Sequence, residues 1–171
     1  MAELKRNTAF KKGMIALFAA IAALCVFLDQ VSKYLALHYL KLGTAKPFLP
    51  GLIEFLRIEN RGAAFGVLQG QMLFFFLITA VILSLILYLL YRLPAERRYL
   101  LLVANLAFLT GGALGNLWDR LTRGSVVDFL SFIPISFPVF NVADIFVTGA
   151  AFGFVLLFCF YYKEEEFTFL R

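Results

Sequence analysis

Residues 72–91 read MLFFFLITAVILSLILYLLY, and this run of twenty residues without a charge decides the fold class. A helix rises about 1.5 Å per residue, so a run of this length covers the roughly 30 Å hydrocarbon core of a bilayer. Three further segments are apolar enough to cross that core, at about 14–40, 99–118 and 142–162. The sequence therefore predicts an all-α integral membrane protein, with four transmembrane helices in a single membrane-embedded domain of residues 1–171.

The composition supports this class and excludes others. Apolar residues make up 62% of the chain and charged residues 16%, whereas soluble domains hold about 45–50% and 25%. The net charge of +5 could indicate nucleic-acid binding, but the basic residues lie in small clusters beside the spans, where they determine topology. We therefore expect no nucleic-acid partner. Cys25 and Cys159 lie in apolar segments far apart in sequence, so neither a disulfide nor a metal site is expected.

The distribution of lysine and arginine predicts the orientation of the four spans. Basic residues are densest before the first span, in the short second connection and after the fourth span: Lys5, Arg6, Lys11, Lys12, Arg92, Arg97, Arg98 and Lys163. The positive-inside rule places these ends in the cytoplasm. The sequence therefore predicts that both termini are cytoplasmic and that the connections 41–71 and 119–141 face outward.

The two outer connections are too long to be simple turns, and loops of such length are usually functional. Residues 52–60 partly alternate between apolar and polar, as a half-exposed strand at the membrane surface would. Pro134 and Pro138 favour an extended segment in the second connection. We expect a small extracytoplasmic β-rich subdomain here.

Polar residues inside the spans need a partner or a function, since an ionisable side chain costs about 2.5–3.5 kcal/mol to insert. Asp29 and Lys33 lie four residues apart in the first span. Asp29 could therefore either form a helical ion pair with Lys33 or belong to a functional site. Asn116 and Arg120 share one face at the end of the third span. Arg120 could equally be an interfacial anchor that extends to the membrane surface.

Two further acids lie at the ends of the second outer connection. Asp128 is surrounded in sequence by apolar residues, a setting that raises the pKa of a carboxyl. Asp144 follows Asn141 by three residues, so this pair could simply cap the fourth span. If the connection folds back, however, the two carboxyls meet near the outer surface. A lone His38 without an H-E-x-x-H motif excludes a zinc-protease site, which leaves the carboxylates as the candidate chemistry.

Five ordered blocks of this sequence resemble one known family. They are Asp29-Gln30-Val31-Ser32-Lys33, Asn60-Arg61-Gly62-Ala63-Ala64-Phe65, Gly112-Ala113-Leu114-Gly115-Asn116-Leu117-Trp118-Asp119-Arg120, Gly124-Ser125-Val126-Val127-Asp128-Phe129 and Phe140-Asn141-Val142-Ala143-Asp144. The sequence resembles the bacterial lipoprotein signal peptidases, or signal peptidase II, a family of aspartyl proteases of the cytoplasmic (inner) membrane. The resemblance implies that Asp128 and Asp144 are the catalytic pair. It implies that Asp29, Lys33, Asn60, Gly62, Asn116, Arg120, Asn141 and Ala143 bind substrate or support the site. Arg61 departs from the family, which more often has a small polar residue there.

The resemblance also implies the substrate. It would be a prolipoprotein whose signal peptide ends at a diacylglyceryl-modified cysteine, cut just before that cysteine, with membrane lipids as the other partners. Two carboxylates that share a proton can activate water without a metal or cofactor. A small transporter or proton relay that uses the same acids is the competing interpretation, and a scaffold pinned by polar residues is a third.

Overall fold

Four long helices lie side by side in the computed structural model, which describes residues 2–62, 70–135 and 137–170. They are α1 (Ala2–Tyr39), α2 (Met72–Arg92), α3 (Leu100–Arg123) and α4 (Val142–Leu156), with a short helical turn η2 (Arg97–Tyr99) before α3 and the turns η3 (Leu157–Tyr161) and η4 (Glu164–Leu170) after α4. Each of the four is long and apolar enough to span a membrane, when α3 is taken together with η2 and α4 together with η3. The prediction of four transmembrane helices is therefore confirmed.

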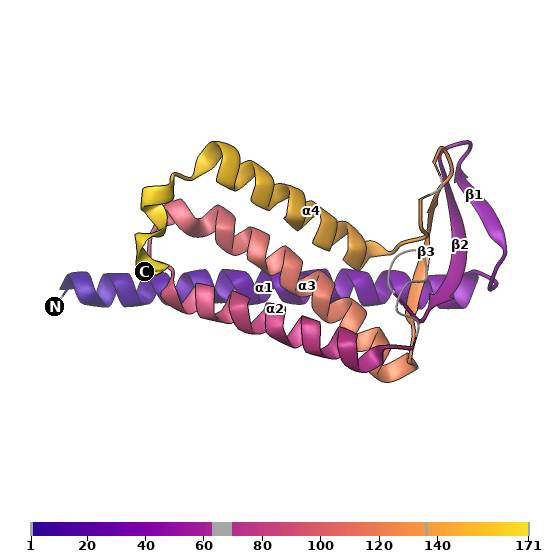
Figure 1. Cartoon of the computed structure of the whole chain (residues 1–171), viewed down its shortest axis with the longest axis horizontal. Helices are drawn as coiled ribbons and strands as arrows, with labels where there is room; N and C mark the ends of the chain where they lie inside the picture. The colour runs from indigo at the N-terminus through magenta and orange to yellow at the C-terminus, as the bar shows by residue number, and fades with distance from the viewer. Residues whose placement is uncertain (1, 63–69, 136, 171) are drawn as a thin grey trace.

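A small antiparallel sheet covers one end of this bundle, at the end opposite both termini (Figure 1). Its order is β1 (Ala45–Leu49), β2 (Ile53–Asn60) and β3 (Val126–Phe132). The strand expected at residues 52–60 is β2. It pairs with both neighbours, so the two outer connections are joined into one unit.

Helix α3 continues beyond the predicted end of the third span. From hydropathy, the span was expected to end at about residue 118, but α3 continues to Arg123. The helix stops at Gly124, which adopts a left-handed conformation with φ of 72°. Glycine tolerates that conformation without steric cost and commonly terminates helices. The charged residues Asp119 and Arg120 give no hydropathy signal for this last turn, and in the structure both side chains have partners within the protein.

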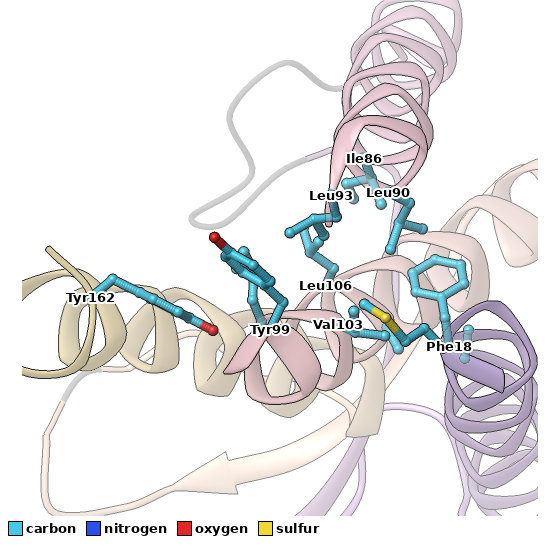
Figure 2. Packing of buried hydrophobic residues seen from close by; sticks show 12 residues of the cluster. Phe18, Ile86, Leu90, Leu93, Tyr99, Val103, Leu106 and Tyr162 are labelled. Atoms are coloured by element: carbon cyan, nitrogen blue, oxygen red, sulfur yellow. The ribbon is translucent and has the colours of Figure 1, made fainter. Parts of the chain in front are cut away.

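The bundle is apolar outside and polar at several points inside. Near the ends that carry the termini, α1, α2 and α3 meet in an apolar cluster that includes Phe18, Leu90 and Val103 (Figure 2). The side chains of Leu73 and Tyr91 on α2 are 69% and 81% exposed, as expected for a helix that faces lipid. The fully buried side chains of the bundle, by contrast, include charged ones, and these surround the site described next.

Glycines on α3 let its neighbours approach closely. A β-carbon at Gly115 would lie 2.5 Å from Oδ2 of Asp29 on α1, and one at Gly112 would lie 2.5 Å from the carbonyl oxygen of Ala143 on α4. Both distances are too short for a real side chain, so only glycine fits at these crossings. The α1–α3 and α3–α4 contacts thereby bring the polar residues of three helices together.

Candidate active site

Asp128 is held in place by the sheet and by two amide side chains. It lies on β3 opposite Ile58 of β2, and it is only 2% exposed. Its Oδ2 accepts a hydrogen bond of 3.0 Å from Asn60 Nδ2, and its Oδ1 accepts one of 2.7 Å from Asn141 Nδ2. The carboxyl therefore has a fixed orientation.

Asp144 is held by the first turn of α4. Asn141 Oδ1 accepts from the Asp144 backbone N–H at 3.0 Å, and Asp144 Oδ2 accepts from the Asn141 backbone N–H at 3.0 Å. This is a capping box, so the capping interpretation is correct as a description of structure. The capping box uses only Oδ2 of Asp144, however. The other carboxyl oxygen, Oδ1, accepts a hydrogen bond of 2.8 Å from Asn116 Nδ2 on α3.

Asn141 joins the two acids. Its side-chain amide donates to Asp128 while its backbone N–H donates to Asp144. The connection folds back as expected, because Phe140 exchanges backbone hydrogen bonds with Leu130 of β3, each 2.9 Å long. Asp128 and Asp144 therefore meet at one place, although they belong to a strand and a helix.

A buried ion cluster lies behind the acids and contains Lys33, which is completely inaccessible to solvent. Its Nζ lies 2.8 Å from Asp29 Oδ2 and 3.1 Å from Asp119 Oδ2. It also donates to Asn116 Oδ1 at 2.8 Å, and Asn116 in turn donates to Asp144. The helical ion pair of Asp29 and Lys33 is thus present, as one part of a larger network.

The cluster also fixes the start of α4. Asp29 Oδ1 accepts at 2.9 Å from the backbone N–H of Ala143, the residue directly before Asp144. Asp119 Oδ2 accepts at 3.2 Å from the backbone N–H of Val127, the residue directly before Asp128. One buried cluster thus holds the backbone next to each of the two acids.

Two members of this cluster were not among the expected site residues. Asp119 belongs to it through Lys33, and Gln30 Nε2 donates to both Asp29 Oδ2 and Asp119 Oδ1, at 3.0 and 3.2 Å. The available signal was helical spacing, because Asp119 lies one turn after Gly115 on the face that meets α1.

Arg120 points inward instead of extending to the membrane surface. Its guanidinium donates to the carbonyl oxygens of Gly62 and Asn116 at 3.2 and 3.3 Å, and it lies 4.3 Å from the ring centroid of Phe75 on α2. The structure therefore does not support the interpretation of Arg120 as an interfacial anchor. Gly62 is buried beside it, whereas Ala63, Ala64 and Phe65 of the same block lie outside the described residues.

The two acids line a cavity of about 640 Å³, which we call the main cavity. Among the described residues, its polar lining is Asn60, Asn116, Arg120, Asp128, Asp144 and Thr148. Gly62 also lines it, and its other walls are largely apolar, from α2, α4 and residues 137–140. The remaining expected residues, Asp29, Lys33, Asn141 and Ala143, do not line it and are buried behind it. The expected site residues thus form a lining layer and a supporting layer.

The surroundings of Asp128 let it keep its proton to a higher pH than an ordinary aspartate does. Burial raises the pKa of Asp128 from its usual value to about 6, and the nearby charge of Asp144 acts in the same direction. Hydrogen bonds from Asn60 and Asn141 and the charge of Lys33 oppose part of this rise. Two neighbouring carboxyls with one proton between them can act as an acid and a base at once. Within the described residues no group of three His, Cys, Asp or Glu side chains could hold a metal ion.

Comparisons with known proteins give a consistent result. Residues 21–161 match the family model of signal peptidase (SPase) II. The lipoprotein signal peptidase of Enterococcus faecalis is 36% identical over 153 residues, covering 90% of this chain and 92% of the relative. That of Brevibacillus brevis is 44% identical over 128 residues, covering 75% and 85%. A solved bacterial membrane enzyme structure at 2.3 Å superimposes with a TM-score of 0.75 at 34% identity, covering 83% of this chain and 87% of the other.

Proposed function

The chain belongs to the signal peptidase II family, and from that premise we propose that it removes the signal peptide of diacylglyceryl-modified prolipoproteins, with Asp128 and Asp144 as catalytic residues. The cut lies just before the lipidated cysteine. The observation that carries the assignment of the acids is Asn141, which hydrogen-bonds both carboxyl groups at the wall of the main cavity. Membership in a peptidase family disfavours the transporter alternative.

The pair of acids performs the proton transfers. The ionised carboxyl takes a proton from a water molecule, whose oxygen attacks the scissile carbonyl carbon. The protonated carboxyl donates a hydrogen bond to the oxygen that becomes negative. When the C–N bond breaks, a proton passes from the pair to the departing amine of the cysteine, so the pair ends with the one proton it began with. The raised pKa of Asp128 supports the presence of this proton.

The other residues keep this pair in position. Asn60 and Asn141 orient Asp128, and Asn116 orients Asp144, each by donating an amide N–H. Asp29 and Lys33 act one step further away, through the Ala143 backbone and Asn116. These are positioning residues, because they touch neither the water nor the scissile bond.

Arg120 and the apolar walls of the main cavity are assigned to the substrate. Arg120 fixes the backbone of Gly62 and forms part of the polar lining near the acids. Signal peptides and acyl chains are apolar, so Phe75, Ile145 and Phe152 in the cavity lining suit them. The substrate would enter from the bilayer, between helices.

We further propose that the protein lies in the bacterial cytoplasmic membrane with both termini in the cytoplasm. The termini lie at one end of the bundle and the sheet at the other (Figure 1). Dense basic clusters flank the spans at the end with the termini, which supports a cytoplasmic location for that end. The sheet and the main cavity would then face outward.

The test uses purified protein in detergent, incubated with diacylglyceryl-modified and unmodified forms of one preprolipoprotein. A peptidase cleaves in detergent without an ion gradient, and only the modified form should be cut, immediately before the cysteine. No cleavage of the modified form by folded protein would contradict the proposed activity. Equal cleavage of both forms would contradict the proposed specificity.

A further inference from the structure

A second cavity, of about 310 Å³, lies beside the main cavity, and we call it the arginine cavity. Its described lining contains three arginines, Arg61, Arg120 and Arg123, and no acidic residue. Arg120 lines both cavities. The proposed peptidase chemistry does not account for a concentration of positive charge here.

Two of the three guanidinium groups have capacity to bind a ligand. Arg120 is committed to Gly62 and Asn116, as described above. The Arg123 side chain is 41% exposed, and its ion pair with Asp119 is long, with 3.7 Å between Nε and Oδ1. Arg61 is exposed, and its guanidinium has no hydrogen bond or ion pair with the part of the chain that the structure describes.

The backbone around the arginine cavity also favours an anion. The cavity lies where α2 begins at Met72 and α3 ends before Gly124. The first turn of α2 contains no acidic residue, and Gln71 gives no side-chain cap, so the positive end of this helix is not neutralised. Guanidinium groups bind phosphate oxygens in pairs, which makes phosphate the anion that three arginines fit best.

The position of the cavity in the fold indicates where the phosphate comes from. Met72 begins one membrane span and Arg123 ends another, so the cavity lies at the level where the bundle leaves the hydrocarbon. At the same ends of α2 and α3, Leu73, Trp118 and Leu121 are 69%, 56% and 57% exposed, and tryptophan is typical of the bilayer interface. Basic pockets between membrane helices on the cytoplasmic side bind lipid headgroups. The same pairing of guanidinium with phosphate applies at the outer face. The diacylglyceryl group of the substrate carries no phosphate and would not use such a cavity.

We infer that the arginine cavity binds the phosphate headgroup of an anionic phospholipid from the surrounding bilayer. Arg61 and Arg123 supply most of the binding, Arg120 adds the third charge, and the acyl chains lie along the exposed apolar side chains of α2 and α3. Such a lipid would be bound directly beside the main cavity, at the side formed by Arg120 and Phe75.

The test measures lipid binding by the purified full-length chain in a neutral detergent. Native mass spectrometry would compare phosphatidylglycerol with phosphatidylcholine of the same acyl chains, and inorganic phosphate would be added as a competitor. We expect phosphatidylglycerol to bind in preference to phosphatidylcholine, with no displacement by an equal concentration of phosphate. Equal binding of both lipids would overturn the inference, and displacement by phosphate would show a site for free phosphate instead.

Matched variants locate the site. Each guanidinium near a membrane surface contributes about fivefold to affinity, so Arg61→Gln with Arg123→Gln should weaken phosphatidylglycerol binding about 25-fold. Lysine at both positions keeps the charge but lacks the planar guanidinium, so this variant should lose an intermediate amount of phosphatidylglycerol affinity. It also tests the site if the glutamine variant does not fold. Arg97→Gln and Lys41→Gln each remove one charge, at opposite ends of the bundle, and should leave phosphatidylglycerol binding nearly unchanged. Undiminished binding by the double variants would overturn the inference. Cleavage of substrate in lipid-free detergent, measured in parallel, reports on the proposed function separately.

Discussion

Replacing Lys33 by methionine should be among the most destabilising single changes in this chain. The substitution keeps much of the side-chain volume but removes the ammonium that lies 2.8 Å from Asp29 and 3.1 Å from Asp119. All three side chains are completely buried, so water cannot replace the lost partner. Removing one partner of a buried ion pair costs about 3–5 kcal/mol, because it leaves an uncompensated charge inside the protein.

The effect should be visible in thermal unfolding in detergent. For a chain of this size each kcal/mol lowers Tm by about 2–4 °C, so Lys33→Met should lower Tm by between about 6 and 20 °C at pH 7. Adding Asp29→Asn should recover part of the loss at pH 7, because it removes one of the two unpaired charges.

Lys41→Met provides the matched control, since Lys41 is exposed just beyond the end of α1. Its Tm should stay within about 2 °C of the unaltered protein, as for most surface substitutions. A Lys33→Met variant as stable as this control at pH 7 would refute the reasoning. A deficit that Asp29→Asn did not reduce would show that lost packing, and not unpaired charge, is the cause.

Three further predictions concern packing, pH and the substrate cavity. Gly115→Ala forces a β-carbon to within 2.5 Å of Asp29 and should cost about 1–3 kcal/mol by thermal unfolding, whereas Gly13→Ala, with open space around it, should not destabilise. Because the pKa of Asp128 is raised to about 6, the folded state binds a proton that the unfolded state releases, so stability should fall by about 3 kcal/mol as the pH rises from about 4 to about 6. Asp128→Asn should flatten that dependence, and an unchanged slope would argue against the raised pKa. Arg120→Ala should reduce cleavage in detergent but leave measurable activity, because it removes positioning and not proton transfer; complete inactivity of folded Arg120→Lys would contradict this assignment.

Hydropathy predicted the spans well because it reports a local property. Each transmembrane helix satisfies its own backbone hydrogen bonds, so twenty apolar residues suffice to identify it. The same reasoning located β2, whose residues partly alternate. It could not locate β3, because Val126–Asp128 are all buried and give no alternating pattern.

The supporting network could not be predicted from sequence because it depends on how the helices meet. The spacing of Asp29 and Lys33 indicated an ion pair, and the structure contains it. The participation of Asp119 depends on the close crossing at Gly115, which sets the register between α1 and α3. The sequence predicted that Asp128 and Asp144 meet, because the loop between them must fold back. It did not predict that Asn141 hydrogen-bonds both acids, since this depends on the positions of β3 and α4 in three dimensions.

The central claim is that Asp128 and Asp144 act together as the catalytic pair. The most direct measurement is the cleavage rate of a diacylglyceryl-modified substrate by Asp128→Asn, Asp144→Asn and the double variant, each first confirmed as folded. Asparagine keeps the size of aspartate and remains suited to the start of a helix, but an amide can neither accept the proton of water nor share one. We expect each single variant to lose at least about a thousandfold in rate, with the double variant scarcely worse, because the two acids act as a unit. Substantial cleavage by either folded single variant would contradict the account.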